Sequence, residues 1–106
     1  MTIQEFVTEE LQVPVTIAGN GLIVEAIEIV FDEHSHKFYP RLSAITGKTT
    51  RQLEKLLRDA KNKSISYMTE DLKQVIFGED NPTVTEYIVK ATQYYRRRYH
   101  ENQEER

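Results

Sequence analysis

Hydrophobic residues recur every three or four positions along most of the chain, as on one face of a helix, and no segment keeps the alternation of a strand. The first such segment covers about Ile3 to Gln12 and stops before Val13-Pro14, because proline disfavours helical geometry in the residue before it. Residues 18–21 predict a turn in which Asn20 can cap a second helix. The inward positions of that second helix are Ile23, Ala26, Ile27, Val30 and Phe31.

Two helices separated by a tight turn are predicted in the middle of the chain. Pro40 suits the first turn of a third helix, which ends at Gly47 because glycine readily adopts the left-handed conformation found at helix ends. Thr49 and Gln52 have the spacing of a reciprocal capping box, so a fourth helix is expected from Thr50 to about Lys63.

Two further helices complete the pattern. The fifth covers about Thr69 to Phe77, ends at Gly78 and is expected to bury Leu72, Val75 and Ile76. Thr83 and Glu86 form another capping box, and the sixth helix places Val84, Tyr87, Ile88, Ala91 and Tyr95 on one face. A polar tail over about residues 100–106 should fray. Residues 1–106 therefore predict one compact, all-α domain of six helices.

The fourth predicted helix has two chemically different faces. At about 100° per residue, Leu53, Leu56, Leu57 and Ala60 gather on one side, opposite Arg51, Lys55, Arg58 and Asn62. Two helices joined by a short turn containing glycine, here about residues 38–63, are typical of the helix-turn-helix, whose second helix enters the major groove. Lys and Arg release counterions from phosphates, Arg can bind guanine and Asn can bind adenine.

Charge is distributed unevenly, although the net charge is only -3. Residues 1–36 contain seven acidic and no basic side chains, whereas residues 37–63 contain eight basic and two acidic ones. A polyanion would therefore meet one basic sector. Asp59 in that sector repels phosphate, unless it pairs with Lys55 or accepts from cytosine. We predict that Arg51, Lys55, Arg58 and Asn62 read bases and that Lys48, Arg41 and Lys63 hold phosphates.

Several short segments occur in an order and spacing that characterise one family. They are Val13-Pro14, Ile17, Gly19 and Glu25-Ala26-Ile27, then Tyr39-Pro40, Thr49, Glu54, Arg58 and Ala60, then Phe77-Gly78, Pro82-Thr83 and Glu86. From Leu11 to about Arg98, the chain thereby resembles the C-terminal DNA-binding effector domain of the sporulation-initiation response regulators (stage zero sporulation protein A) of endospore-forming bacteria.

The resemblance implies a six-helix fold and sequence-specific binding of duplex DNA, with Lys55 and Arg58 at positions where that family contacts DNA. Gln52 stands where the family has a basic residue and Asp59 where it has histidine, so the family's target sequence is not expected. These 106 residues show no counterpart of the family's receiver domain. The resemblance thus implies a stand-alone transcriptional regulator, compatible with a homodimer or a side-by-side pair on DNA.

Another function remains open, and several classes of activity are not indicated. A protein-interaction module, or an antagonist of another regulator, could use the same fold and the acidic first third. Asp32, Glu33, His34 and His36 are metal-ligand types, but adjacent helical positions do not converge on one ion, so neither metal nor cofactor is expected. No nucleophile has an evident base, which argues against an enzyme. The chain lacks cysteine, a membrane span and a signal peptide, so the cytoplasm is the expected compartment.

Overall fold

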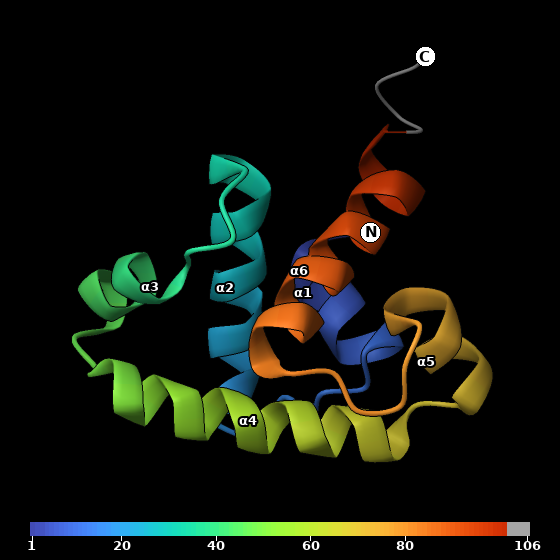
Figure 1. Cartoon of the computed structure of the whole chain (residues 1–106), viewed down its shortest axis with the longest axis horizontal. Coiled ribbons are helices and arrows are strands. Elements are labelled where there is room, and N and C mark those ends of the chain that lie inside the picture. Colours follow the sequence, from blue (N-terminus) through green and yellow to red (C-terminus); the bar gives the residue numbers. More distant parts are fainter. Residues whose placement is uncertain (102–106) are drawn as a thin grey trace.

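The structure is a computed structural model that describes residues 1–101, with side chains described as far as Tyr99. The described residues form six α-helices and two π-helical segments without any strand (Figure 1), which confirms the all-α, six-helix prediction. The segments are α1 (Ile3–Glu5), η1 (Phe6–Glu10), α2 (Gly19–Glu33), α3 (Tyr39–Thr46), α4 (Thr50–Tyr67), α5 (Glu70–Phe77), α6 (Val84–Tyr95) and η2 (Arg96–Glu101). Residues 100 and 101 of the predicted tail belong to η2, and residues 102–106 lie outside the described residues.

Local sequence signals set most of the helix ends. The hydroxyl of Thr49 accepts a hydrogen bond from the backbone N–H of Gln52 at 3.2 Å. In return, the side-chain oxygen of Gln52 accepts one from the backbone N–H of Thr49 at 2.9 Å. This capping box starts α4 as predicted, and another one starts α6. Gly47 (φ 74°) and Gly78 (φ 71°) end α3 and α5 in the left-handed conformation.

The start of α2 departs from the sequence prediction. The helix already begins at Gly19, so the turn lies before it and Asn20 is not the cap. Asn20 is buried instead; its amide group donates to the Val13 carbonyl and accepts from Gln4, each at 3.0 Å. Buried polar groups need such partners, and an interior position supplies both of them. The side chain that looked like a helix cap therefore fastens the N-terminal segment to α2.

Helices α2 and α4 cross at a very short distance. A Cβ atom on Gly19 would lie 2.4 Å from the Cβ of Ala60 and 2.9 Å from the carbonyl oxygen of Leu56, closer than non-bonded atoms approach. Glycine at this position is what allows the two backbones to meet. The crossing buries Leu53, Leu57 and Ala60 of α4, as the sequence predicts for the inward face.

Helix α6 packs against both α2 and α4 (Figure 1), and one buried hydrogen-bond chain ties the elements together. The hydroxyl of Tyr87 on α6 donates to Ser64 on α4 at 2.7 Å, and Ser64 donates to the carbonyl of Leu11. Burial raises the pKa of Tyr87, so its hydroxyl keeps its proton and stays a donor. The chain links the N-terminal segment, α4 and α6 in the core.

An aromatic cluster joins η1 to the C-terminal part of the described chain. The ring of Phe6 lies 5.2 Å from that of Tyr95, 6.0 Å from Tyr94 and 6.2 Å from Tyr99. Tyr95 also meets Phe31 of α2 edge-on at 5.9 Å. These tyrosines therefore pack against the core of the same chain, Tyr95 as a buried residue and Tyr94 and Tyr99 as partly buried ones.

Two predicted details of the later helices are wrong. Helix α4 continues to Tyr67, beyond the expected end at Lys63. Val75 of α5 is 63% exposed, whereas Ile76 is buried and the hydrocarbon stem of Lys73 is covered in its place. The buried side of α5 is formed by Lys73, Ile76 and Phe77, and Val75 lies on the other side of the helix.

Replacement of Gly19 tests the close crossing. We expect Gly19→Ala to destabilise the fold by about 1–3 kcal/mol, because the added methyl overlaps Ala60. Gly21→Ala is the matched control, since a Cβ there meets nothing within 4 Å, and it should stabilise the same helix by up to about 1 kcal/mol. Urea unfolding of the two variants measures the difference, and equal free energies of unfolding would contradict the crossing.

Candidate nucleic-acid interface

Helix α4 forms one long edge of the molecule, and its outer side is not covered by another helix (Figure 1). The outer stripe consists of Arg51, Lys55, Arg58 and Asn62, all of which are exposed. The inward face of the same helix is buried against α2 and α6. The structure therefore places the four predicted base-reading residues on the free side of α4.

Three members of the outer stripe surround one shallow hollow of about 590 Å³ on the surface. Arg51, Lys55 and Arg58 line it from successive turns of α4, together with Thr49, Gln52 and Glu54. Asn62 lies one turn beyond Arg58 and does not line the hollow. The N-terminal half of the stripe thus forms a concave cationic surface, and Glu54 is an acidic neighbour that the sequence prediction missed.

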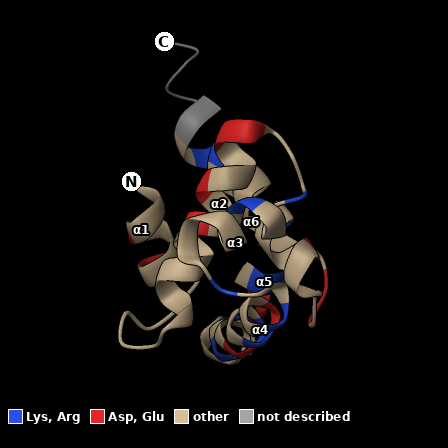
Figure 2. Cartoon of the chain, turned by 90° about the vertical axis from the view of Figure 1, so that its left-hand side faces the viewer, with Lys and Arg blue, Asp and Glu red and all other residues tan. Residues whose placement is uncertain are grey.

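The cations of the outer stripe pair with no carboxylate among the described residues. Within the described part of the chain, the ion pairs seen are Arg41 with Glu33, Lys73 with Glu70 and Lys90 with Glu79. Pairing of Lys55 with Asp59, one of the two alternatives left open for that carboxylate, is not among the ion pairs of the described residues. Figure 2 shows α4 at the lower edge of the molecule with both basic and acidic positions. Asp59 therefore remains an unneutralised negative charge near the stripe.

The three residues predicted to contact phosphates are all exposed, but only Arg41 among them is in an ion pair with a described residue. Lys48 and Lys63 are exposed, and the backbone of Lys48 is held by hydrogen bonds from Ser43 to its carbonyl at 2.6 Å and from its amide to Thr46 at 3.2 Å. Arg41 pairs with Glu33 at 3.2 Å, with 61% of its own side chain exposed. Exposed ion pairs contribute at most about 1 kcal/mol, so this pair leaves Arg41 available to a phosphate.

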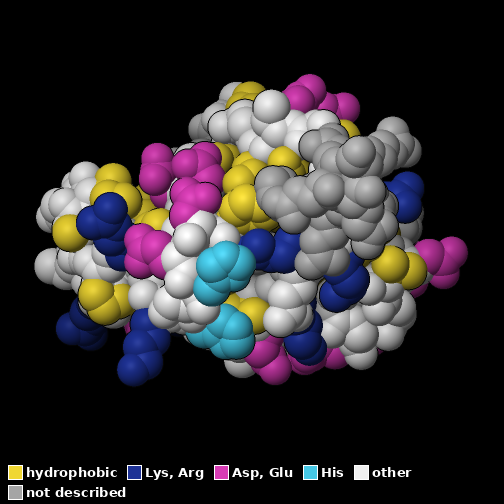
Figure 3. All heavy atoms as spheres, turned by 90° about the horizontal axis from the view of Figure 1, so that it is seen from above, with side chains coloured by type: hydrophobic (Ala, Val, Ile, Leu, Met, Phe, Trp, Pro, Cys, Tyr) yellow, Lys and Arg dark blue, Asp and Glu magenta, His cyan; other side chains and the backbone are white. Residues whose placement is uncertain are grey.

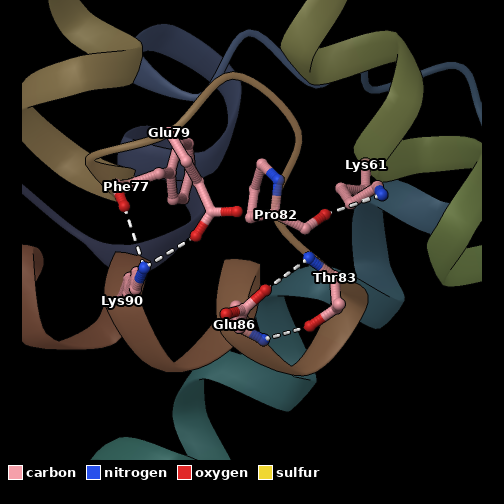
Figure 4. A network of polar contacts seen from close by, with 7 residues as sticks. All are labelled: Lys61, Phe77, Glu79, Pro82, Thr83, Glu86 and Lys90. Atoms are coloured by element: carbon pink, nitrogen blue, oxygen red, sulfur yellow. Dashed lines mark hydrogen bonds and ion pairs between the residues drawn. The ribbon is translucent and has the colours of Figure 1, made fainter.

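Lys61 is a further cation beside the stripe, and the sequence prediction assigned it no role. It is only 7% exposed, and its ammonium group donates to the carbonyl of Pro82 at 2.8 Å (Figure 4). Burial, and then the neighbouring charge of Arg58, lower the pKa of Lys61. The signal was present in the sequence, because Lys61 follows Leu57 by four residues and so lies on the inward face.

A smaller hollow lies on the opposite side of the molecule from α4, beside the two described histidines (Figure 3). It measures about 180 Å³, and His34, His36 and Arg96 are among the residues that line it. Arg96 has a structural role, since it donates to the Phe31 carbonyl at 2.8 Å and lies over the Phe31 ring. Among the described residues, no three His, Cys, Asp or Glu side chains are placed to share a metal ion.

Comparisons with known proteins do not assign the chain to a family. No family model matches it, and no curated protein matches it significantly. None of the described helices combines the length and apolar character that crossing a bilayer requires.

The buried charge of Lys61 predicts a pH dependence of stability. Its pKa is lower in the folded chain than its unfolded value of about 10.4, so between the two values the unfolded chain binds more protons. The free energy of unfolding should therefore rise with pH over that interval relative to Lys61→Met, which cannot titrate. Urea unfolding of both proteins from neutral pH to about pH 10.4 measures the change.

Lys63→Met is the control for this titration, because Lys63 is exposed two residues away on the same helix. Lys61→Met should change the pH dependence of the unfolding free energy more than Lys63→Met does, because Lys61 is the buried residue of the two. Equal pH dependence of the two variants would show that burial does not lower the pKa of Lys61.

Proposed function

We propose that this chain is a transcriptional regulator that binds double-stranded DNA sequence-specifically, with α4 in the major groove. The observation that carries the proposal is the outer stripe, in which Arg51, Lys55 and Arg58 are exposed and form no ion pair with the described residues, while the opposite face of α4 is buried. Unpaired surface cations on one edge suit a polyanion, because each phosphate contact releases condensed counterions. Arg and Asn side chains on the same stripe supply base-specific hydrogen bonds.

The dimensions of α4 support the same proposal. An α-helix with its side chains is about 10–12 Å across, and the major groove is about 12 Å wide. Helix α4 has 18 residues and is preceded by α3 after three residues, Gly47 to Thr49. Two helices with such a short connection, of which the second is exposed on its outer side, are typical of the helix-turn-helix. The resemblance to the sporulation-regulator effector domain points the same way.

The double variant Lys55→Ala, Arg58→Ala tests whether α4 contacts DNA. We expect it to lose about tenfold or more in affinity for a selected duplex, because contacts of this kind contribute about 1–3 kcal/mol each. The expected slope of log affinity against log salt also becomes shallower. Fluorescence anisotropy at several salt concentrations measures both quantities, and circular dichroism checks that the helical content is unchanged.

The control is Lys37→Ala, Arg97→Ala, which removes the same charge from exposed positions outside α4. It should change affinity only slightly through the net charge. If the two double variants bind equally well, α4 is not the reading helix. The duplex itself comes from selection out of a random pool, and the spacing of repeats among selected sites reports whether two copies bind side by side.

Replacement of Asp59 is predicted to strengthen DNA binding, whereas replacement of the cations weakens it. Asp59→Asn removes an unpaired negative charge near the outer stripe while keeping the side-chain shape. We expect affinity for random-sequence duplex DNA to increase by a few-fold at low salt and the gain to vanish at high salt, because exposed charges are screened. Glu9→Gln, at an exposed position of η1, is the matched control. Weaker binding by Asp59→Asn would indicate that the carboxylate itself binds a base.

A protein-interaction module is the second candidate, and the acidic side of α2 favours it. Burial, then the charges of Glu25 and Asp32, raise the pKa of Glu28, so carboxylates are crowded on this side of α2. Such a surface suits a basic partner protein. Failure of the unmodified protein to bind any duplex at low salt would favour this candidate over DNA binding.

A further inference from the structure

A second surface hollow, of about 390 Å³, lies between α4, the start of α3 and the first turn of α6. It adjoins the first hollow, because Glu54 and Arg58 line both of them. Its remaining lining residues are Tyr39, Lys61, Thr83, Val84 and Thr85. The hollow therefore continues the cationic surface of α4 towards α6.

Lys61 makes this hollow unusual, because its cation is buried without an anion. One of its three N–H groups donates to the Pro82 carbonyl at 2.8 Å, and no carboxylate within the described residues pairs with it. Arg58 lies near enough to lower the pKa of Lys61 further. Burial of a cation beside another cation is unfavourable unless a negative group compensates them.

The first turn of α6 adds hydrogen-bond donors to the same place. The first amides of a helix have no partner within the helix, and the capping box satisfies those of Thr83 and Glu86 (Figure 4). The backbone amides of Val84 and Thr85, which have no acceptor within the helix, and the Thr85 hydroxyl are left to donate to a ligand. The positive end of the helix dipole favours an anion at this point.

Hydrogen bonds and an ion pair hold the loop beside this hollow in place. Lys90 donates to the Phe77 carbonyl at 2.9 Å and pairs with Glu79 at 3.0 Å, which holds the loop that leads to Pro82 (Figure 4). Burial, then the charge of Glu54, raise the pKa of Tyr39, so its hydroxyl stays protonated and can donate. Glu54 is the acidic residue of the lining, and Arg58 with Lys61 leaves that lining net positive.

We propose that this hollow binds one backbone phosphate of the DNA duplex whose major groove receives α4. Lys61 neutralises the phosphate and the first turn of α6 donates hydrogen bonds to it, while Arg58 lines the boundary with the first hollow and adds to the positive charge there. The inference rests on the proposed function and adds to it a second point of attachment. A phosphate held beside α4 fixes the depth and angle of that helix in the groove, because backbone contacts position a protein while base contacts specify the sequence.

Thr85→Glu tests the site with little risk to folding. Thr85 is exposed at the second position of α6, where a carboxylate interacts favourably with the helix dipole, so the variant should be at least as stable as the unmodified protein. The same carboxylate repels a phosphate. We expect about tenfold weaker binding to the selected duplex and a salt slope shallower by about one, with the preferred sequence unchanged.

Gln93→Glu is the matched control, because it adds the same charge at an exposed position near the other end of α6. Its affinity should fall by less than about twofold, since the charge lies beyond the Debye length of about 10 Å from the hollow at 0.1 M salt. Equal losses for Thr85→Glu and Gln93→Glu would overturn the phosphate site.

The phosphate site and the proposed function can fail separately. If Thr85→Glu binds normally while Lys55→Ala, Arg58→Ala does not, only the phosphate site is wrong. If the unmodified protein binds no duplex, both proposals are wrong.

Discussion

The contact between Gly19 and Ala60 determines how α4 is presented. Because the missing Cβ of Gly19 lets α2 approach the backbone of α4, Leu53, Leu57 and Ala60 on the apolar side of α4 are buried in the core, while Leu56 is partly buried. Burial of one face fixes the rotation of a helix about its own axis, so the opposite face projects outward. The exposure of Lys55 and Arg58 is therefore a consequence of packing on the other side of the helix.

The same packing explains why two cations of α4 differ so much in how far their charges are removed from water. Arg58 projects from the outer stripe, where water solvates its charge. Lys61, three residues later, turns towards α6 and loses most of its solvent. One neutral carbonyl, that of Pro82, compensates it incompletely, which is why its pKa is lowered. A buried cation that pairs with no carboxylate among the described residues is understandable where a ligand supplies the missing charge, as the proposed phosphate would.

The distribution of charge over the molecule complements this local picture. The acidic residues of the first third include Glu25, Glu28 and Asp32 on α2, whose far end points away from α4 in Figure 1. A polyanion approaching the molecule is repelled from that end and attracted to the α4 edge, so the fold orients its proposed ligand before any contact forms. A small negative net charge is thus compatible with DNA binding when the two signs are separated in space.

Periodicity and short-range chemistry determined much of this protein from the sequence alone. The helix starts at Thr49 and Thr83 and the helix ends at Gly47 and Gly78 depend on neighbours within four residues, and so does the division of α4 into two faces.

Tertiary contacts decided the rest, because they join residues that the sequence keeps far apart. The role of Asn20 depended on the carbonyl of Val13 and on Gln4 coming within reach, and the exposure of Val75 depended on which side of α5 meets the core. The hollow beside Lys61 exists only because the first turn of α6, more than twenty residues later, packs across α4. Neither periodicity nor capping rules contain that distance information, since they describe one helix at a time.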